Sequence, residues 1–296
     1  MRETSSPRSE KYLVAVADDF GLSSPVNRAV AEAHDAGVLT AASLMARGSA
    51  FEEAVALAVE RPALSVGLHV TLCGGRSVLP RSEIPLLVDA DGGFEKHPVK
   101  AWLKYRGPEA LFQIEREIEA QIERLEGSGI RPSHVDCHHH LHMKPAIFEI
   151  LCRVAARRGI RWIRIPGESL RHAVGIRSLA RGPMPLLEWI VFGTLRRSHI
   201  TTTREHGLRT ASRTYGLSRT GRITEKYFLH VLDCMVGPLN ELFTHPDLST
   251  DPGRRELKAL TSANVRERIA SLGMKLSGYR ELAEETGAFS SAWGRA

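Results

Sequence analysis

Short strand-like runs alternate with longer amphipathic segments along most of this chain. The strand-like runs cover residues 12–17, 39–46, 64–72, 133–137, 160–165, 239–244 and 274–279. Helical spacing of apolar residues is clearest over residues 108–126, where one face carries Leu111, Ile114, Ile118, Ile122 and Leu125. Further helices are expected at 24–34, 51–60 and 145–158. This alternation predicts an α/β protein with a parallel sheet and helical crossovers.

The same pattern predicts one domain over residues 12–285, between a disordered tail at 1–11 and a flexible tail at 286–296. Residues 73–98 form a long loop rich in glycine and proline. The strand and helix rhythm breaks over residues 166–222, and we expect a helical insertion there, over the mouth of the barrel. The first residues lack the apolar core of a signal peptide, and no apolar run is long enough to span a bilayer.

Composition is that of an ordinary globular protein, with 43% hydrophobic and 25% charged residues in 296. Its four cysteines are scattered and contain no Cys-x-x-Cys pair, which argues against a zinc ribbon or a disulfide scaffold and favours a cytoplasmic location. The net charge of +6 indicates a basic surface or attraction to anionic lipid. Aromatic residues are only 6% and do not interleave with basic ones, so nucleic acid is not an expected partner.

Polar side chains gather where the predicted strands end. Because the carboxyl ends of parallel strands meet at one rim, where active sites assemble, we expect these side chains to lie close together. They are Asp18, Asp19, His69, Asp136, His138, Arg164 and His245. Taken singly, Asp18 and Asp19 could be an acidic helix start, and His69 a structural histidine. Their shared rim favours a functional site.

Residues 134–142 read His-Val-Asp-Cys-His-His-His-Leu-His and hold five of the 13 histidines. Imidazole is a common ligand of divalent transition metals. Extended backbone would place Asp136, His138, His140 and His142 on one face, whereas a helical turn would pair His138 with His142. Either geometry lets two or more imidazoles converge, so spacing alone leaves the ligands open.

These motifs resemble those of the YdjC-type carbohydrate deacetylases, distant relatives of the NodB polysaccharide deacetylases. The resemblance rests on residues 17–23 (Ala-Asp-Asp-Phe-Gly-Leu-Ser), 67–69 (Gly-Leu-His), 134–142 and 244–246 (Thr-His-Pro). It implies an irregular TIM-like (β/α) barrel that removes acetyl groups from N-acetylglucosamine units. It also implies one divalent ion, zinc or magnesium.

The resemblance further assigns roles to individual residues. The metal ligands would be Asp19, His69 and His138. Asp18 would be the general base, Arg164 the arginine that orients it, and His245 the general acid. Outside this correspondence, we expect Asp136, His140 and His142 to bind substrate, and the two histidines could instead shape the pocket or orient the ligand.

Three further stretches, residues 37–45, 75–80 and 83–92, resemble the subgroup associated with hopanoid biosynthesis (HpnK). In that subgroup the substrate would be N-acetylglucosaminyl bacteriohopanetetrol, a glycolipid. The alternatives are a deacetylase of soluble chitooligosaccharides and a metal- or sugar-binding protein without turnover. The sequence leaves the oligomeric state open, a homodimer included.

One apolar segment, residues 184–197, bears on a membrane contact. It carries Leu186, Leu187, Trp189, Ile190, Val191 and Phe192, followed by Arg196 and Arg197. One interpretation is an interfacial helix with both arginines near anionic headgroups, which would make the protein peripheral at the inner membrane. The other is a helix packed on the barrel.

Overall fold

The computed structural model describes residues 10–168 and 184–284, and over residues 184–189 it describes the helix backbone without the side chains. Within these ranges the strands form one sheet in the order β5-β4-β3-β2-β1-β7-β6, with β8 paired to β1, and every pairing is parallel. The strands are β1 (Lys11–Phe20), β2 (Ala41–Leu44), β3 (Ser65–Val70), β4 (His134–Cys137), β5 (Trp162–Ile163), β6 (Arg213–Tyr215), β7 (Leu239–Thr244) and β8 (Met274–Leu276).

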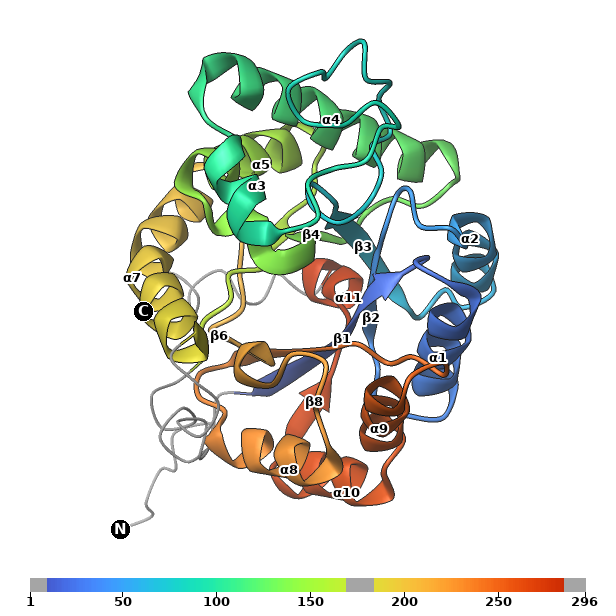
Figure 1. Ribbon diagram of the computed structural model, residues 1–296. Helices are drawn as coiled ribbons and strands as arrows, with labels where there is room; N and C mark the ends of the chain where they lie inside the picture. The colour runs from blue at the N-terminus through green and yellow to red at the C-terminus, as the bar shows by residue number, and fades with distance from the viewer. Residues whose placement is uncertain (1–9, 169–183, 285–296) are drawn as a thin grey trace.

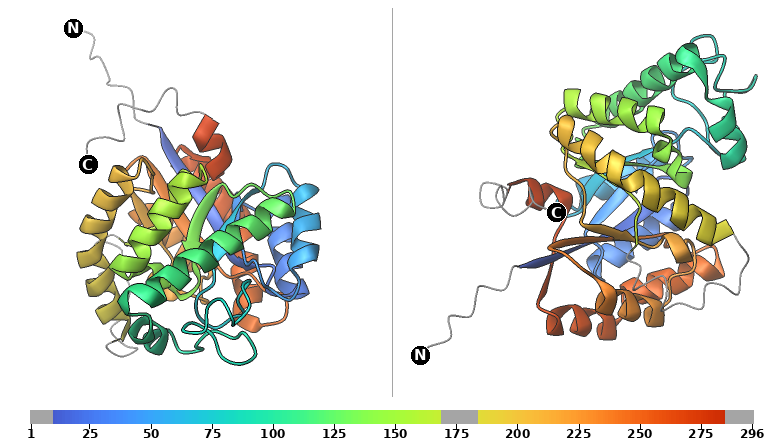
Figure 2. Two further views of the ribbon diagram at one scale, coloured as in Figure 1. Left: turned by 90° about the horizontal axis from the view of Figure 1, so that it is seen from above. Right: turned by 90° about the vertical axis from the view of Figure 1, so that its left-hand side faces the viewer.

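Helices surround the strands, as Figure 1 and the two further views of Figure 2 show. The α-helices are α1 (Ser24–Asp35), α2 (Phe51–Val59), α3 (Pro98–Lys104), α4 (Gly107–Gly127), α5 (Pro145–Arg157), α7 (Met184–Glu205), α8 (Glu225–Cys234), α9 (Asp251–Leu260), α10 (Ala263–Ser271) and α11 (Tyr279–Glu284). Two short 3₁₀ helices, η1 (His138–Met143) and η3 (Leu217–Arg219), follow β4 and β6.

The two edges of the sheet approach each other, which curls it into an irregular barrel. The residues leading into β6 pair with β5, since the Ile163 N–H donates to the Arg209 carbonyl (2.9 Å) and the Arg209 N–H to the Arg161 carbonyl (2.8 Å). The pairing of Trp162 with Arg209 is again parallel. The predicted TIM-like α/β fold is thereby confirmed.

Alternation along β1 separates two cores. Leu13, Ala15 and Ala17 face the large core between the sheet and the outer helices. Tyr12 and Val14 face a smaller inner cluster that also contains Trp162, Phe243 and Tyr279. Helix α11 contributes to this inner cluster and lies in the middle of the ring in Figure 1. Side chains therefore fill the barrel interior.

Most predicted elements are found within a few residues, and three differ. Strand β1 is longer than the expected 12–17 and includes Asp18 and Asp19. Helix α3 was not expected, because its seven residues are too few to show a helical period and they begin at the end of the loop at 73–98. Residues 213–215 belong to the sheet as β6, so the segment 166–222 is only partly an insertion.

Helix α7 contains the apolar segment considered for membrane contact. Ile190 and Val191 are exposed, whereas Phe192 packs against the large core. Arg196 is buried, which contradicts an interfacial helix that exposes both arginines on its surface. Leu186, Leu187 and Trp189 lie outside the described side chains. Among the described residues, no helix is both long enough and apolar enough to cross a membrane.

Candidate functional site

A β-bulge at the end of β1 positions the two adjacent carboxylates. The pairing of β1 with β2 is regular up to Ala17 and shifts before Phe20. Asp19 has φ 63°, a left-handed conformation that aspartate tolerates better than most residues. An extra residue in a strand re-aims the side chains beside it. Asp18 is therefore buried inside the barrel, while Asp19 turns toward β3 and η1.

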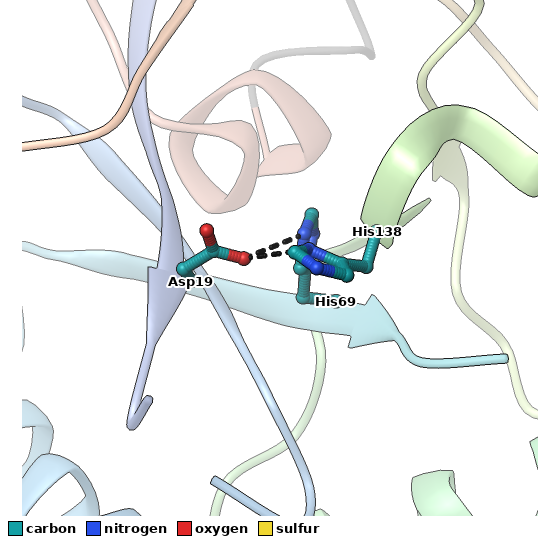
Figure 3. A group of neighbouring side chains, drawn as sticks. All are labelled: Asp19, His69 and His138. Atoms are coloured by element: carbon teal, nitrogen blue, oxygen red, sulfur yellow. Dashed lines mark ion pairs between the residues drawn. The ribbon is translucent and has the colours of Figure 1, made fainter. Parts of the chain in front are cut away.

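Asp19, His69 and His138 converge on one point, from β1, β3 and the start of η1 (Figure 3). Asp19 Oδ1 lies 3.2 Å from His69 Nε2 and 2.9 Å from His138 Nδ1. This oxygen is buried and has no hydrogen-bond donor of good geometry among the described residues. Three ligand atoms that face a common point, with close contacts but no hydrogen bond to the carboxylate oxygen, are the arrangement expected of a metal site.

The distances fit a divalent ion. Ligands about 2.0–2.1 Å from zinc in a tetrahedral site lie about 3.3 Å apart, and in an octahedral magnesium site about 3.0 Å apart. One carboxylate and two imidazoles leave further positions for water and substrate, as catalytic metal sites do. The three residues could thus hold either ion.

Asp136 orients His69 from inside the barrel. Its Oδ1 accepts a hydrogen bond from His69 Nδ1 (2.7 Å), which aims Nε2 at Asp19. Although burial alone would lower it, Asp136 and the neighbouring carboxylate of Asp18 raise the pKa of His69 to about 10. The surroundings therefore favour positive charge at His69 Nε2, which a proton or a bound cation satisfies. Carboxylates that bond a ligating histidine in this way are usual in metal sites.

A buried arginine joins three carboxyl groups. Arg164 is 1% exposed and donates to both oxygens of Asp18, at 2.7 and 2.8 Å. It also lies 2.8 Å from Asp136 Oδ2 and bonds Glu241 through Nε. Burial opposes its charge, yet these carboxylates raise the pKa of Arg164 well above its ordinary value. Asp19, beside His69 and His138, adds a fourth carboxyl group to this region. One permanent cation does not balance four carboxyl groups, so a divalent ion would offset part of the excess negative charge.

Sequence reasoning missed the residues that complete this network. The Tyr279 hydroxyl donates to Glu241, and Ser43 donates to Asp136 Oδ2 (2.7 Å) and contacts His134 Nε2 (3.1 Å). A charged residue inside the apolar strand Leu-Asn-Glu-Leu-Phe-Thr was a usable signal for Glu241. Tyr279 and Ser43 carried none, because their importance depends on which strands and helices meet.

The histidine cluster is neither extended nor regularly helical. His139 and His140 have φ of 54° and 52°, and this kink inside η1 separates His138, at the candidate metal site, from the later histidines. His140 is half-buried against Phe243. Asp136 and His142 are 0% exposed, which corrects their expected contact with substrate. His142 instead donates through Nε2 to the Arg164 carbonyl (2.9 Å) and fixes the backbone beside the site.

His245 follows β7 at the rim and is half-buried. Its Nε2 lies 3.9 Å from Asp18 Oδ2, too far for a hydrogen bond, and its Nδ1 is buried without a partner among the described residues. The backbone N–H of His245 donates to the Glu256 carboxylate of α9 (2.5 Å). Asp18, Asp19 and His245 line a cavity of about 150 Å³ together with residues of α1 and α9.

Burial of His142 predicts a specific loss of stability in acid. Burial lowers the pKa of His142 from 6.5 to about 4. The unfolded chain takes up this proton below pH 6.5 and the folded protein does not, so the stabilisation is present above pH 6.5 and is lost as the pH falls toward 4. By pH 5 the unfolding free energy should have fallen by about 2 kcal/mol from this group alone.

The variant His142→Gln keeps a donor and removes the titration. Urea unfolding measures the unfolding free energy at pH 7 and at pH 5. From pH 7 to pH 5, this free energy should fall by about 2 kcal/mol less in His142→Gln than in the wild type. His97→Gln, at an exposed histidine, should lose as much as the wild type. Equal losses in the wild type and His142→Gln would contradict the prediction.

Comparison with known proteins agrees with this geometry. The family model described as YdjC-like protein matches residues 12–271. A carbohydrate deacetylase of Brevibacillus brevis is 33% identical over 91% of this chain and 99% of its own. A chitooligosaccharide deacetylase of Salmonella typhimurium is 32% identical over 92% of this chain and 100% of its own. An Enterococcus faecalis structure, described as a cellobiose-phosphate cleavage protein, aligns with TM-score 0.74 and 27% identity over 93% and 99% of the two chains.

The match extends from β1 through α10 and therefore includes Asp19, His69, His138 and His245. The chain belongs to the YdjC-like protein family.

Proposed function

We propose that the protein is a metal-dependent carbohydrate deacetylase that hydrolyses the acetamide of an N-acetylglucosamine unit. The observation that carries the proposal is the convergence of Asp19, His69 and His138 beside a separate buried carboxylate, Asp18. A protein that only binds metal needs no such additional carboxylate. The names of the relatives, carbohydrate and chitooligosaccharide deacetylase, support the same activity.

In this proposal Asp19, His69 and His138 hold one divalent ion. When bound, the ion supplies Lewis-acid polarisation of the acetyl oxygen and lowers the pKa of a water molecule. Two imidazoles among three ligands favour zinc, and the added carboxylates around the site are compatible with magnesium.

Asp18 is the proposed general base. Arg164 holds both of its oxygens through a bidentate pair, which fixes the plane of the carboxylate. Because Asp18 also lines the cavity beside Asp19, it can accept a proton from a water molecule there as that water attacks the acetyl carbon. Arg164 is thus a positioning residue, while Asp18 touches the reacting atoms.

His245 is the proposed general acid, which donates a proton to the departing amine. It lines the same cavity, at the end of the strand beside β1. No carboxylate among the described residues holds its buried Nδ1, so the ring depends on the backbone bond to Glu256 and on Phe243 for its place. The amine leaves only after protonation, which makes this step necessary.

Two substrates are compatible with the site. The stretches at residues 37–45, 75–80 and 83–92 favour the hopanoid glycolipid, and exposed Ile190 and Val191 on α7 offer an apolar surface for it. The chitooligosaccharide alternative is favoured by the Salmonella relative. Incubation with each substrate, followed by mass spectrometry for loss of acetyl, separates them.

The variant Asp18→Asn tests the role of the base. It should retain the metal and lose about two to four orders of magnitude in turnover, because an amide cannot accept the proton. Acetate release from diacetylchitobiose and metal content by mass spectrometry measure the two properties on one sample. Turnover equal to that of the wild type would remove Asp18 from this role, and absence of acetate release by the wild type on both substrates would overturn the proposed function.

A further inference from the structure

A second cavity, of about 380 Å³, lies near the amino-terminal ends of β6 and β7, whereas Asp18 and Asp19 lie near the carboxyl-terminal end of β1. It is bounded by the second half of α7, by residues 208–213 before and at the start of β6, and by residues 236–238 just before β7. Helix α7 and β6 are neighbours in Figure 1. Because β7 runs from Leu239 to Thr244, this cavity is separated from the rim by about 17 Å of strand. The proposed deacetylase reaction does not use it.

Arginines dominate the wall of this cavity. Arg196 and Arg204 come from α7, and Arg209 and Arg213 from the segment that leads into β6. The described residues that line it include no aspartate or glutamate. Arg196, Arg209 and Arg213 form no ion pair with any described carboxylate. Among the described residues, these three positive charges therefore have no internal counter-charge.

Arg196 is the most unusual of the four, because it is only 9% exposed. It donates to the carbonyls of Ala211 (3.3 Å) and Ser212 (2.5 Å), while its Nε is buried and has no hydrogen-bond partner in the described part of the chain. Burial and then the charge of Arg213 lower the pKa of Arg196 to about 10, so it stays charged at neutral pH. Arg164, which is buried more deeply still, is by contrast surrounded by three carboxyl groups.

The remaining wall can hold an organic ligand. Thr210 Oγ1 is buried and has no hydrogen-bond partner among the described residues. Apolar side chains complete the lining, namely Ile200, Leu208, Val236 and Pro238. A cavity of this volume, with a few charged groups on an apolar wall, is typical of small-molecule sites. Guanidinium groups are the donors that match phosphate oxygens in pairs.

We propose that this cavity, bounded by α7, β6 and the start of β7, binds the phosphate group of a small phosphorylated molecule. The phosphate supplies the counter-charge that Arg196, Arg209 and Arg213 lack, and the apolar wall contacts the group that carries it. The phosphate could belong to a soluble ester or to a phospholipid headgroup. The site is independent of the deacetylase centre.

Glucose 6-phosphate is the soluble probe, and glucose is its uncharged control. Isothermal titration should show binding of the phosphate ester alone, weakened at least about tenfold by Arg213→Gln and by Arg209→Gln. Arg197→Gln, at an exposed arginine on the same helix that does not line the cavity, should bind as the wild type does. Flotation with phosphatidylcholine vesicles, with and without phosphatidic acid, tests the lipid source using the same variants.

Weakening by Arg209→Gln and Arg213→Gln in titration assigns a soluble ester, and weakening in flotation alone assigns a headgroup. Absence of binding in both assays, or an equal loss in Arg197→Gln, overturns the proposal. Circular dichroism checks that Arg209→Gln and Arg213→Gln are folded. If one of them does not fold, the other still tests the proposal. Acetate release by Arg213→Gln without phosphate should equal that of the wild type, which keeps this test separate from that of the deacetylase.

Discussion

Asp19→Asn should lose the bound metal and, with it, about three orders of magnitude in deacetylase turnover, or about 4 kcal/mol of transition-state stabilisation. Asparagine tolerates the left-handed conformation of Asp19 and keeps its shape, so the fold should survive. It lacks the negative charge that balances a divalent ion between His69 and His138. Metal content after reconstitution, and acetate release from diacetylchitobiose, measure the two effects.

Asp247→Ala is the matched control, since Asp247 lines the same cavity as Asp19 but is not one of the three converging ligands. It should retain the metal. His138→Ala should behave like Asp19→Asn and lose metal and turnover together. Full metal content in Asp19→Asn would refute the ligand set, even if turnover fell.

Arg164→Met is expected to destabilise the protein by about 3–5 kcal/mol at pH 7, the largest effect on stability that we predict. Methionine fills similar volume but leaves Asp18, Asp136 and Glu241 buried without their shared partner. Removing one side of a buried ionic network costs more than the network contributes, because the remaining charges stay desolvated. Urea unfolding measures the change.

Arg158→Met provides the comparison, since Arg158 pairs with Glu123 and Glu126 at the surface and should cost about 0–1 kcal/mol. Adding Glu241→Gln to Arg164→Met should recover part of the loss, because one of the unpaired carboxylates is removed. A loss below about 1 kcal/mol in Arg164→Met, as small as that expected at the surface, would contradict the prediction.

The sheet and most helices could be predicted because their signals are local. Helix α4 was placed within one residue at each end from its apolar spacing, and β7 without error. The backbone at the end of β1 and within the histidine cluster could not be predicted. The bulge in β1 and the two left-handed residues of the cluster depend on contacts with other strands. Periodicity carries no information on such irregular backbone.

The sequence indicated which residues belong to the candidate site better than it indicated the contacts between them. Asp19, His69 and His138 were reached through a family resemblance, whereas spacing within residues 134–142 left the ligands open. Asp136 and His142 were expected to meet substrate, yet both are fully buried. Their roles follow from pairs that are distant in sequence, such as Asp136 with His69, and those pairs become visible only in the folded chain.

The bulge in β1 has a consequence for engineering. In a regular strand neighbouring side chains point to opposite faces, so an Asp-Asp pair grafted onto another barrel would send one carboxylate toward the helices. The shifted register at Asp18 and Asp19 lets one strand serve both the interior and the rim. A transplanted site would therefore need residues 17–20 together with their irregular backbone. Transferring the two aspartates alone would not place both carboxylates at the site.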